Sequence, residues 1–129
     1  MSLDKSFEEE RIGNAILAAA MRVHSALGPG LLEGVYEACL AHELALAGFE
    51  IQKQVSVPIT YGDVKLEAGL RLDLLIGQRV VVEVKSVEKL LPVHLAQVMT
   101  YLKISRHALG FLLNFNVVHM KDGIKRVVV

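Results

Sequence analysis

The chain has 129 residues, a length that fits one domain, and 53% of them are hydrophobic, which is enough for a packed core and argues against disorder. Its single cysteine, Cys39, excludes an intrachain disulfide framework and a cysteine-rich zinc site. Acidic and basic side chains balance at 14 each, unlike the strongly basic charge of a stand-alone high-affinity DNA-binding protein. Acidic residues are in excess in residues 1–78 and basic ones in residues 79–129, which allows a local basic face in the second half.

The sequence predicts no association with a membrane. No apolar run approaches the roughly 18 residues that span a bilayer. The polar, acidic start of the chain also differs from the basic segment that opens a secretory signal. We therefore expect a cytoplasmic protein, which fits its single cysteine. Residues 1–6 are expected to form a flexible leader ahead of one domain that fills the rest of the chain.

Two helices are predicted at the start. The first covers residues 7–27 and ends at Gly28-Pro29-Gly30. Its apolar side chains recur at spacings of three and four: Ile12, Ile16, Ala19, Ala20, Val23 and Leu27. The second helix covers residues 32–47 and is capped by Gly48. A connection this short predicts either a packed helical hairpin or a sharply bent pair of helices.

The period then changes from 3.6 to 2, which predicts three strands. Residues 51–61 alternate apolar and polar side chains, and Pro58 indicates an edge strand because it cannot donate to a ladder. Residues 64–76 follow the turn Gly62-Asp63 and place five apolar side chains on one face: Leu66, Leu70, Leu72, Leu74 and Ile76. Residues 79–86 follow Gly77-Gln78 and are apolar on both faces, as in a central strand.

The remaining segments are a helix over residues 92–105, opened by Pro92, and strands over residues 108–115 and 124–129. The order α-α-β-β-β-α-β-β predicts an α/β domain with a mixed sheet. Its first three strands form an antiparallel meander flanked by helices. The strands on either side of the helix 92–105 are expected to be parallel neighbours, because a helical crossover normally connects such strands.

Polar side chains interrupt the most apolar strand. Glu83 and Lys85 are two residues apart and project from one face, and burying them is costly unless they are paired or bind a metal. A two-residue turn at 77–78 would place Asp73 opposite Val82, whereas a bulge or an altered turn would place it beside Glu83. Either arrangement brings two carboxylates within reach of one divalent cation. A structural ion pair, or a strand end in solvent, is the alternative.

Two helices carry further polar groups. His94, Gln97 and Tyr101 form one stripe on the helix 92–105, which could equally be a partly solvated flank. The helix 32–47 places Glu33, Tyr36 and Glu37 on one side. Glu33 lies in the first turn, where the helix dipole favours a carboxylate for structural reasons alone.

Together these residues resemble the PD-(D/E)XK nuclease superfamily, and specifically its GxxExxY family. The matching elements are Gly30, Glu33 and Tyr36 for the pattern that names the family, then Asp73, Glu83-Val84-Lys85 and Gln97 to Tyr101 for the superfamily's Asp, ExK and QxxxY. The likeness extends from about residue 10 to the C-terminus and implies a restriction-endonuclease-like core. Leu72 replaces the proline that often precedes the aspartate.

The resemblance implies a site for Mg²⁺ or Mn²⁺. Asp73, Glu83 and the main-chain carbonyl of Val84 would hold the ion, and Glu33 would reach it through water or hold a second ion. Lys85 would orient the attacking water or stabilise the charge on the phosphate. Gln97, Tyr101 and Tyr36 would position the substrate.

The expected function is therefore metal-dependent hydrolysis of phosphodiester bonds in nucleic acid, DNA rather than RNA. A homodimer is expected from size alone, because one face of a 14.2 kDa chain contacts few phosphates. Two alternatives stay open: a non-catalytic nucleic-acid-binding or assembly module that keeps the fold, and a protein that acts on or binds a small phosphorylated ligand. Intact Asp73, Glu83 and Lys85 favour the nuclease.

Overall fold

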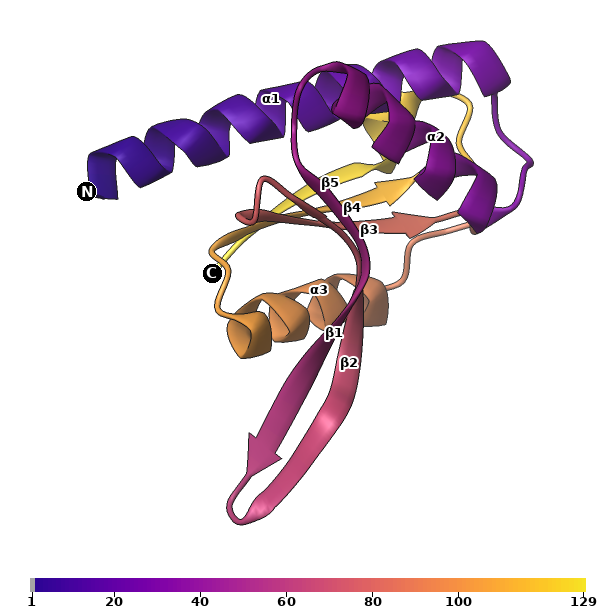
Figure 1. Cartoon of the computed structure of the whole chain (residues 1–129). Helices are drawn as coiled ribbons and strands as arrows, with labels where there is room; N and C mark the ends of the chain where they lie inside the picture. Colours follow the sequence, from indigo (N-terminus) through magenta and orange to yellow (C-terminus); the bar gives the residue numbers. More distant parts are fainter. Residues whose placement is uncertain (1) are drawn as a thin grey trace.

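A computed structural model describes the backbone of residues 2–129 and the side chains of residues 6–129. The elements follow the predicted order, with a short 3-10 helix added before the last strand (Figure 1). They are α1 (Ser2–Leu27), α2 (Glu33–Leu46), β1 (Ile51–Tyr61), β2 (Val64–Ile76), β3 (Val80–Lys85), α3 (Pro92–Ser105), β4 (Leu109–Asn114), η1 (Met120–Gly123) and β5 (Ile124–Val128).

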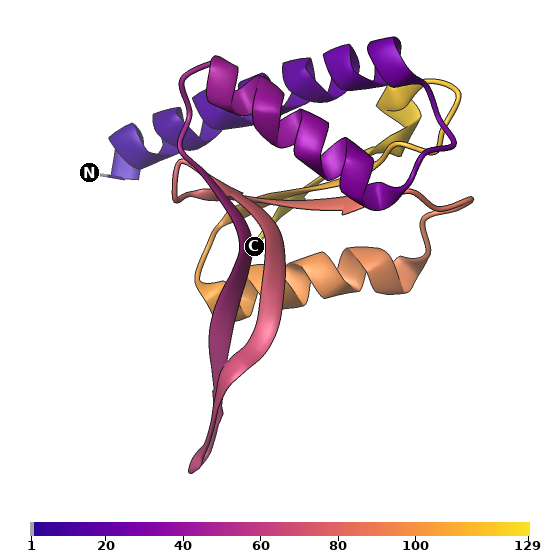
Figure 2. The same cartoon turned by 45° about the vertical axis from the view of Figure 1, so that its right-hand side comes forward.

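The five strands form one sheet in the order β1-β2-β3-β4-β5. β3 and β4 run parallel across the crossover that contains α3, and the other neighbours are antiparallel. The helices α1 and α2 cover one face of the sheet and α3 covers the other (Figures 1 and 2). This architecture confirms the predicted α/β class, the antiparallel meander and the parallel central pair.

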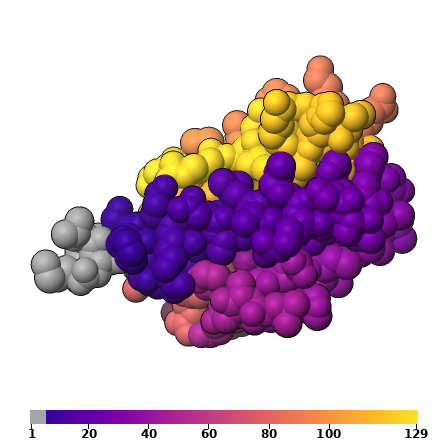
Figure 3. Space-filling model, turned by 90° about the horizontal axis from the view of Figure 1, so that it is seen from above, coloured from indigo at the N-terminus to yellow at the C-terminus, as the bar shows by residue number. Residues whose placement is uncertain are grey.

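Element boundaries agree with the sequence patterns to within a residue at most ends, and α1 is the exception. It begins at Ser2 rather than near Phe7, because no glycine or proline interrupts residues 2–6, so these residues of the expected leader are helical. Seen from above, α1 lies between α2 and the C-terminal segment (Figure 3). No helix within residues 2–129 is long and apolar enough to cross a membrane.

Two apolar cores hold the layers together, one on each face of the sheet. The core under α1 and α2 is the larger and includes Ile12, Ile16, Leu40, Leu44, Leu74, Ile76, Val82, Phe111 and Leu113. The core under α3 consists of Leu72, Leu75, Val81, Val98, Leu102, Leu112 and Val127. Burial of these side chains on both faces explains why β3 and β4 are mostly apolar.

The strands β1 and β2 change faces part-way along their length. Ile51 and Leu74 pack in the core under α1 and α2, whereas Val55 and Leu72 pack in the core under α3. Side chains an even number of residues apart share a face in a regular strand, so the prediction of one apolar face for each strand is wrong. The change occurs at Gln54, whose φ is +50° and which the β1–β2 ladder skips together with Asp73.

Beyond this point the β1–β2 hairpin leaves the sheet and extends past α3 (Figures 1 and 2). The ladder between β2 and β3 accordingly has three pairs and ends at Leu74 and Val82. The side chains at the tip of the hairpin, including Tyr61 and Leu66, are exposed. The departure of the hairpin creates a fork between β2 and β3, and Asp73 lies at that fork.

Candidate active site

Asp73 and Glu83 lie level with each other at the fork. The turn between β2 and β3 has three residues, 77–79, so Ile76 pairs with Val80 instead of Arg79. Continuing this register past Leu74 and Val82 sets Asp73 opposite Glu83. Of the two arrangements considered from the sequence, the altered turn is the one found.

The two carboxylates bond to each other's strands where the regular ladder has ended. The Asp73 amide donates to Glu83 Oε2 over 2.9 Å, and the Val84 amide donates to Asp73 Oδ2 over 2.9 Å. An aspartate carboxylate cannot lie more than a few ångströms from its own amide. The two carboxylates therefore lie close together, as a shared cation would require.

Burial dominates the electrostatics of this pair. Glu83 is only 3% exposed, and burial together with the charge of Asp73 raises its pKa to about 8, against smaller lowering effects of the Asp73 amide and Lys85. The side chain of Lys85 is half-buried on the same face of β3 as Glu83. At neutral pH the site therefore holds a proton on Glu83 unless a further positive charge binds.

The helix α3 presents a polar edge to the acidic pair. Gln97 Nε2 donates to the Tyr101 hydroxyl over 3.0 Å, and both side chains are half-buried. Burial and the charges of Glu83 and Asp73 raise the pKa of Tyr101. The Tyr101 hydroxyl therefore interacts electrostatically with the acidic pair. His94, the third member of the stripe, accepts a hydrogen bond from the Leu91 amide at Nδ1 over 2.9 Å, which gives it a role at the start of the helix.

The helix α2 contributes Glu37, which was not predicted as a site residue. Its side chain is half-buried, and burial, with the charges of Asp73 and Glu33, raises its pKa. Gln54 Nε2 donates to its two carboxylate oxygens over 3.1 and 3.0 Å. Glu33, the predicted residue, lies one turn earlier and is exposed. The spacing of four residues between them was the available signal, since it sets both on one side of the helix.

Tyr36 has a structural role in place of the substrate-positioning role predicted from the sequence. It is fully buried, and its ring stacks on Phe115 with a centroid distance of 4.6 Å. Its hydroxyl donates to the Gly28 carbonyl over 2.6 Å and accepts from the Leu31 amide over 3.1 Å. Tyr36 therefore fixes the connection between α1 and α2 from inside the core.

We expect Tyr36→Phe to lower the free energy of unfolding by about 1–3 kcal/mol, because the Gly28 carbonyl and the Leu31 amide lose a buried partner. Urea denaturation measures the change. Tyr61→Phe is the matched control, because Tyr61 is 82% exposed at the hairpin tip. Equal stability of the two variants would contradict the structural role.

Comparison with known families agrees with this geometry. The model of a family described as the PD-(D/E)XK nuclease superfamily matches residues 10–127, from the first turns of α1 to the end of β5. The chain belongs to the PD-(D/E)XK nuclease superfamily. No curated protein and no solved structure matches it. Membership accounts for the mixed sheet and indicates a nuclease-like function on nucleic acid, and nucleases of this superfamily generally use divalent metals.

A buried polar residue on the neighbouring strand β4 supports the candidate site. Asn114 pairs with Lys85 in the parallel register and is 2% exposed. Its side chain accepts from the Val87 amide over 3.1 Å and donates to the Val87 carbonyl over 2.9 Å. These bonds fix the chain directly after Lys85. Its sequence signal is the same as that of Glu83, a polar residue in an otherwise apolar strand.

The donor set fits a hard divalent cation. Within residues 6–129, no three His, Cys, Asp or Glu side chains are arranged to hold one ion together. A cation at the fork would therefore take two carboxylates, from Asp73 and Glu83, and complete its shell with a main-chain carbonyl and water. Mg²⁺ commonly keeps several waters in such sites, so two carboxylates are sufficient.

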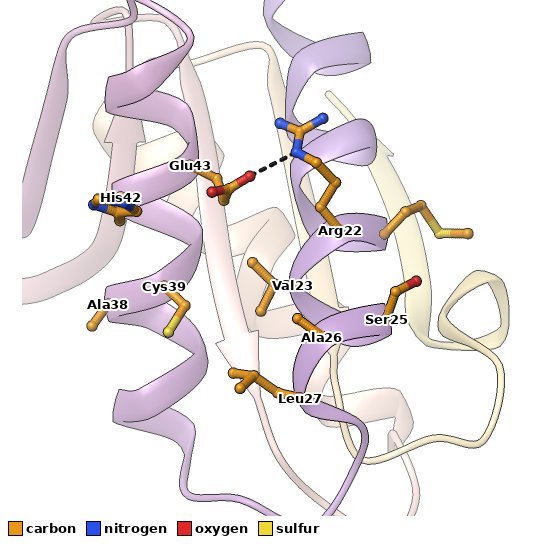
Figure 4. Close-up of a pocket in the computed structure, with 10 residues that line it drawn as sticks. Arg22, Val23, Ser25, Ala26, Leu27, Ala38, Cys39, His42 and Glu43 are labelled. Carbon is orange, nitrogen blue, oxygen red and sulfur yellow. Dashed lines mark hydrogen bonds and ion pairs between the residues drawn. The ribbon is translucent and has the colours of Figure 1, made fainter.

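A separate groove of about 860 Å³ lies between α1 and α2 (Figure 4). Its walls are mainly apolar and include Val23, Leu27 and Cys39, and Arg22 Nε donates to Glu43 Oε1 across it over 2.7 Å. None of its lining residues belongs to the motifs that carry the nuclease resemblance. The groove is therefore not part of the candidate active site.

Proposed function

We propose that this PD-(D/E)XK protein is a metal-dependent nuclease of the GxxExxY type that hydrolyses phosphodiester bonds in nucleic acid. The observation that carries the proposal is the pairing of Asp73 and Glu83 at the fork between β2 and β3, with Lys85 two residues further on the same face. A purely structural role does not require two carboxyl groups to lie side by side, where burial and the charge of Asp73 raise the pKa of Glu83.

Each group at the fork has a distinct task. Asp73, Glu83 and the carbonyl of Val84 would hold Mg²⁺ or Mn²⁺, which when bound acidifies water and polarises a phosphoryl oxygen. Lys85 orients the attacking water and stabilises the negative charge that develops on the phosphate. The helix α2 contributes a further carboxylate that acts through water, for which the sequence motif offers Glu33.

Substrate contacts come from α3 and from the basic second half of the chain. The amide of Gln97 and the hydroxyl of Tyr101 already bond to each other, and together they offer donors and an acceptor to the sugar-phosphate backbone. The excess of basic residues in 79–129 offsets the acidic first half near bound phosphates. We propose DNA as the substrate rather than RNA, and a second copy of the chain as the means of contacting more phosphates.

The decisive test is cleavage of a mixed panel in the presence of Mn²⁺. The panel contains duplex, single-stranded and branched DNA and a structured RNA, and Asp73→Asn serves as the matched inactive protein. We expect cleavage of DNA by the native protein and none by the variant. Binding without cleavage, at every metal concentration, would instead support a non-catalytic nucleic-acid-binding module. Cleavage that survives in Asp73→Asn would contradict the site.

A thermal readout tests the metal without any substrate. An ion that binds the folded site alone stabilises it by ~2.7 kcal/mol at a hundredfold excess over its dissociation constant. We expect Mn²⁺ to raise the melting temperature of the native protein by several degrees. The rise should be mostly lost in Asp73→Asn, since a charged ligand is gone. An equal rise in both proteins would place the ion elsewhere.

A further inference from the structure

Gln54 has an unusual backbone for a residue inside a long strand. Its φ of +50° lies in the left-handed region, where a non-glycine side chain is uncommon. It occupies the register position opposite Asp73, between the pairs Lys53–Leu74 and Val55–Leu72. Such conformations persist where surrounding contacts hold them and concentrate at functional sites.

With this backbone conformation, the side chain of Gln54 contacts Glu37 on α2. Its amide nitrogen lies 3.1 and 3.0 Å from the two carboxylate oxygens of Glu37. Glu37 is repelled by the charges of Asp73 and Glu33 and attracted by Lys53. Without Gln54, repulsion would favour rotation of the Glu37 carboxylate out toward solvent. The amide therefore keeps a third carboxylate near the pair at the fork.

We propose that Gln54 is a positioning residue that holds Glu37 beside Asp73, and that Glu37, more than Glu33, is the α2 carboxylate that serves a cation at the Asp73–Glu83 pair through bound water. This inference rests on the proposed function. Glu37 acts through water because no three acidic side chains within residues 6–129 are close enough to share an ion directly. Glu33 is exposed, whereas Glu37 is half-buried and its carboxylate accepts hydrogen bonds from the Gln54 amide.

The chain offers a closely matched control for Gln54. Gln78 also has a positive φ, +59°, and its amide nitrogen lies 3.2 and 3.1 Å from the two oxygens of Glu50. It belongs to the β2–β3 turn, five residues before Glu83, on the order of 16 Å in an extended strand. Gln78 and Glu50 therefore reproduce the backbone and the contact of Gln54 and Glu37 away from the site.

Calorimetric titration of Mn²⁺ into the full chain tests the inference without measuring activity. Gln54→Ala and Glu37→Gln should each weaken Mn²⁺ binding on the order of tenfold, as is typical when a residue supporting a metal ligand is lost. The double variant should bind no more weakly than either single one, because both remove the same contact. Gln78→Ala and Glu50→Gln should bind like the native protein.

Gln54→Asn tests the hydrogen bonds to Glu37 separately from the left-handed backbone conformation. Asparagine tolerates a left-handed φ better than other side chains but is one carbon shorter and cannot reach Glu37. It should fold and still bind Mn²⁺ as weakly as Gln54→Ala. Native affinity in Gln54→Asn, or a loss in Glu33→Gln larger than that in Glu37→Gln, would overturn the inference.

Asp73→Asn in the same titration separates the inference from the proposed function. If Asp73→Asn abolishes Mn²⁺ binding while the Gln54 and Glu37 variants bind normally, the site stands and the positioning role fails. If Asp73→Asn binds Mn²⁺ like the native protein, the site itself fails.

Discussion

Glu83→Gln is expected to remove most of the pH dependence of stability between about pH 4.5 and 8 in the metal-free protein. The folded chain keeps the Glu83 proton up to a pKa of about 8, whereas an exposed glutamate loses it near 4.5. The folded state therefore binds more protons in this window, and the free energy of unfolding falls as pH rises through it. A shift of this size corresponds to on the order of 3–5 kcal/mol for a side chain so deeply buried.

Urea unfolding at pH 5, 6.5 and 8 measures the effect. Glutamine keeps an oxygen to accept from the Asp73 amide but carries no charge, so the variant should be more stable than the native protein at pH 8. Glu67→Gln is the control, because Glu67 lies exposed on the hairpin. Mn²⁺ should shrink the pH dependence of the native protein, since the bound ion replaces the proton on Glu83. A native stability that is level from pH 5 to 8 would contradict the buried, protonated acid.

Lys85→Ala is expected to lower the cleavage rate on the order of 10³-fold while Mn²⁺ binding persists. In the proposed mechanism the ammonium acts on the attacking water and on the developing phosphate charge, so its removal should affect the transition state more than metal binding. Asp73 and Glu83 stay in place, because their bonds run to the amides of Val84 and Asp73 and not to Lys85.

Single-turnover cleavage and a Mn²⁺ titration, both above pH 8, separate these effects. The pH matters because Lys85 lowers the pKa of Glu83, and its loss would otherwise weaken metal binding through a retained proton. Lys89→Ala is the matched control, an exposed lysine four residues later. Equal loss of cleavage in both variants would indicate a general contribution of positive charge to substrate binding, and would remove Lys85 from the chemistry.

The fold was largely predictable because its signals are local. The 3.6-residue period defined the helices, the two-residue period defined the hairpin, and the crossover helix predicted the parallel pair of β3 and β4. The face change at Gln54 was not predictable, because three polar residues in a row, Gln52, Lys53 and Gln54, do not specify which face the next apolar side chain takes. Packing against two opposite helical layers decides it, and that information is tertiary.

The acidic pair was predictable because charged side chains are costly to bury. Their presence in an apolar strand therefore indicates a site that needs them. The contact between Glu37 and Gln54 was not predicted, because it joins positions 17 residues apart on a helix and a strand. Tyr36 was assigned to the substrate because a motif tyrosine suggests function. Its burial against Phe115 and its bonds to the connection after α1 follow from packing that no spacing reveals.

The departure of the β1–β2 hairpin from the sheet has a structural consequence. Asp73 belongs both to the root of that arm and to the acidic pair, and three ladder pairs join β2 to β3 beside it. The seven residues from Val55 to Tyr61 give the arm a length of roughly 23 Å. Asp73 therefore joins the root of this arm to the acidic pair, through the hydrogen bonds that its amide and carboxylate make with Glu83 and Val84.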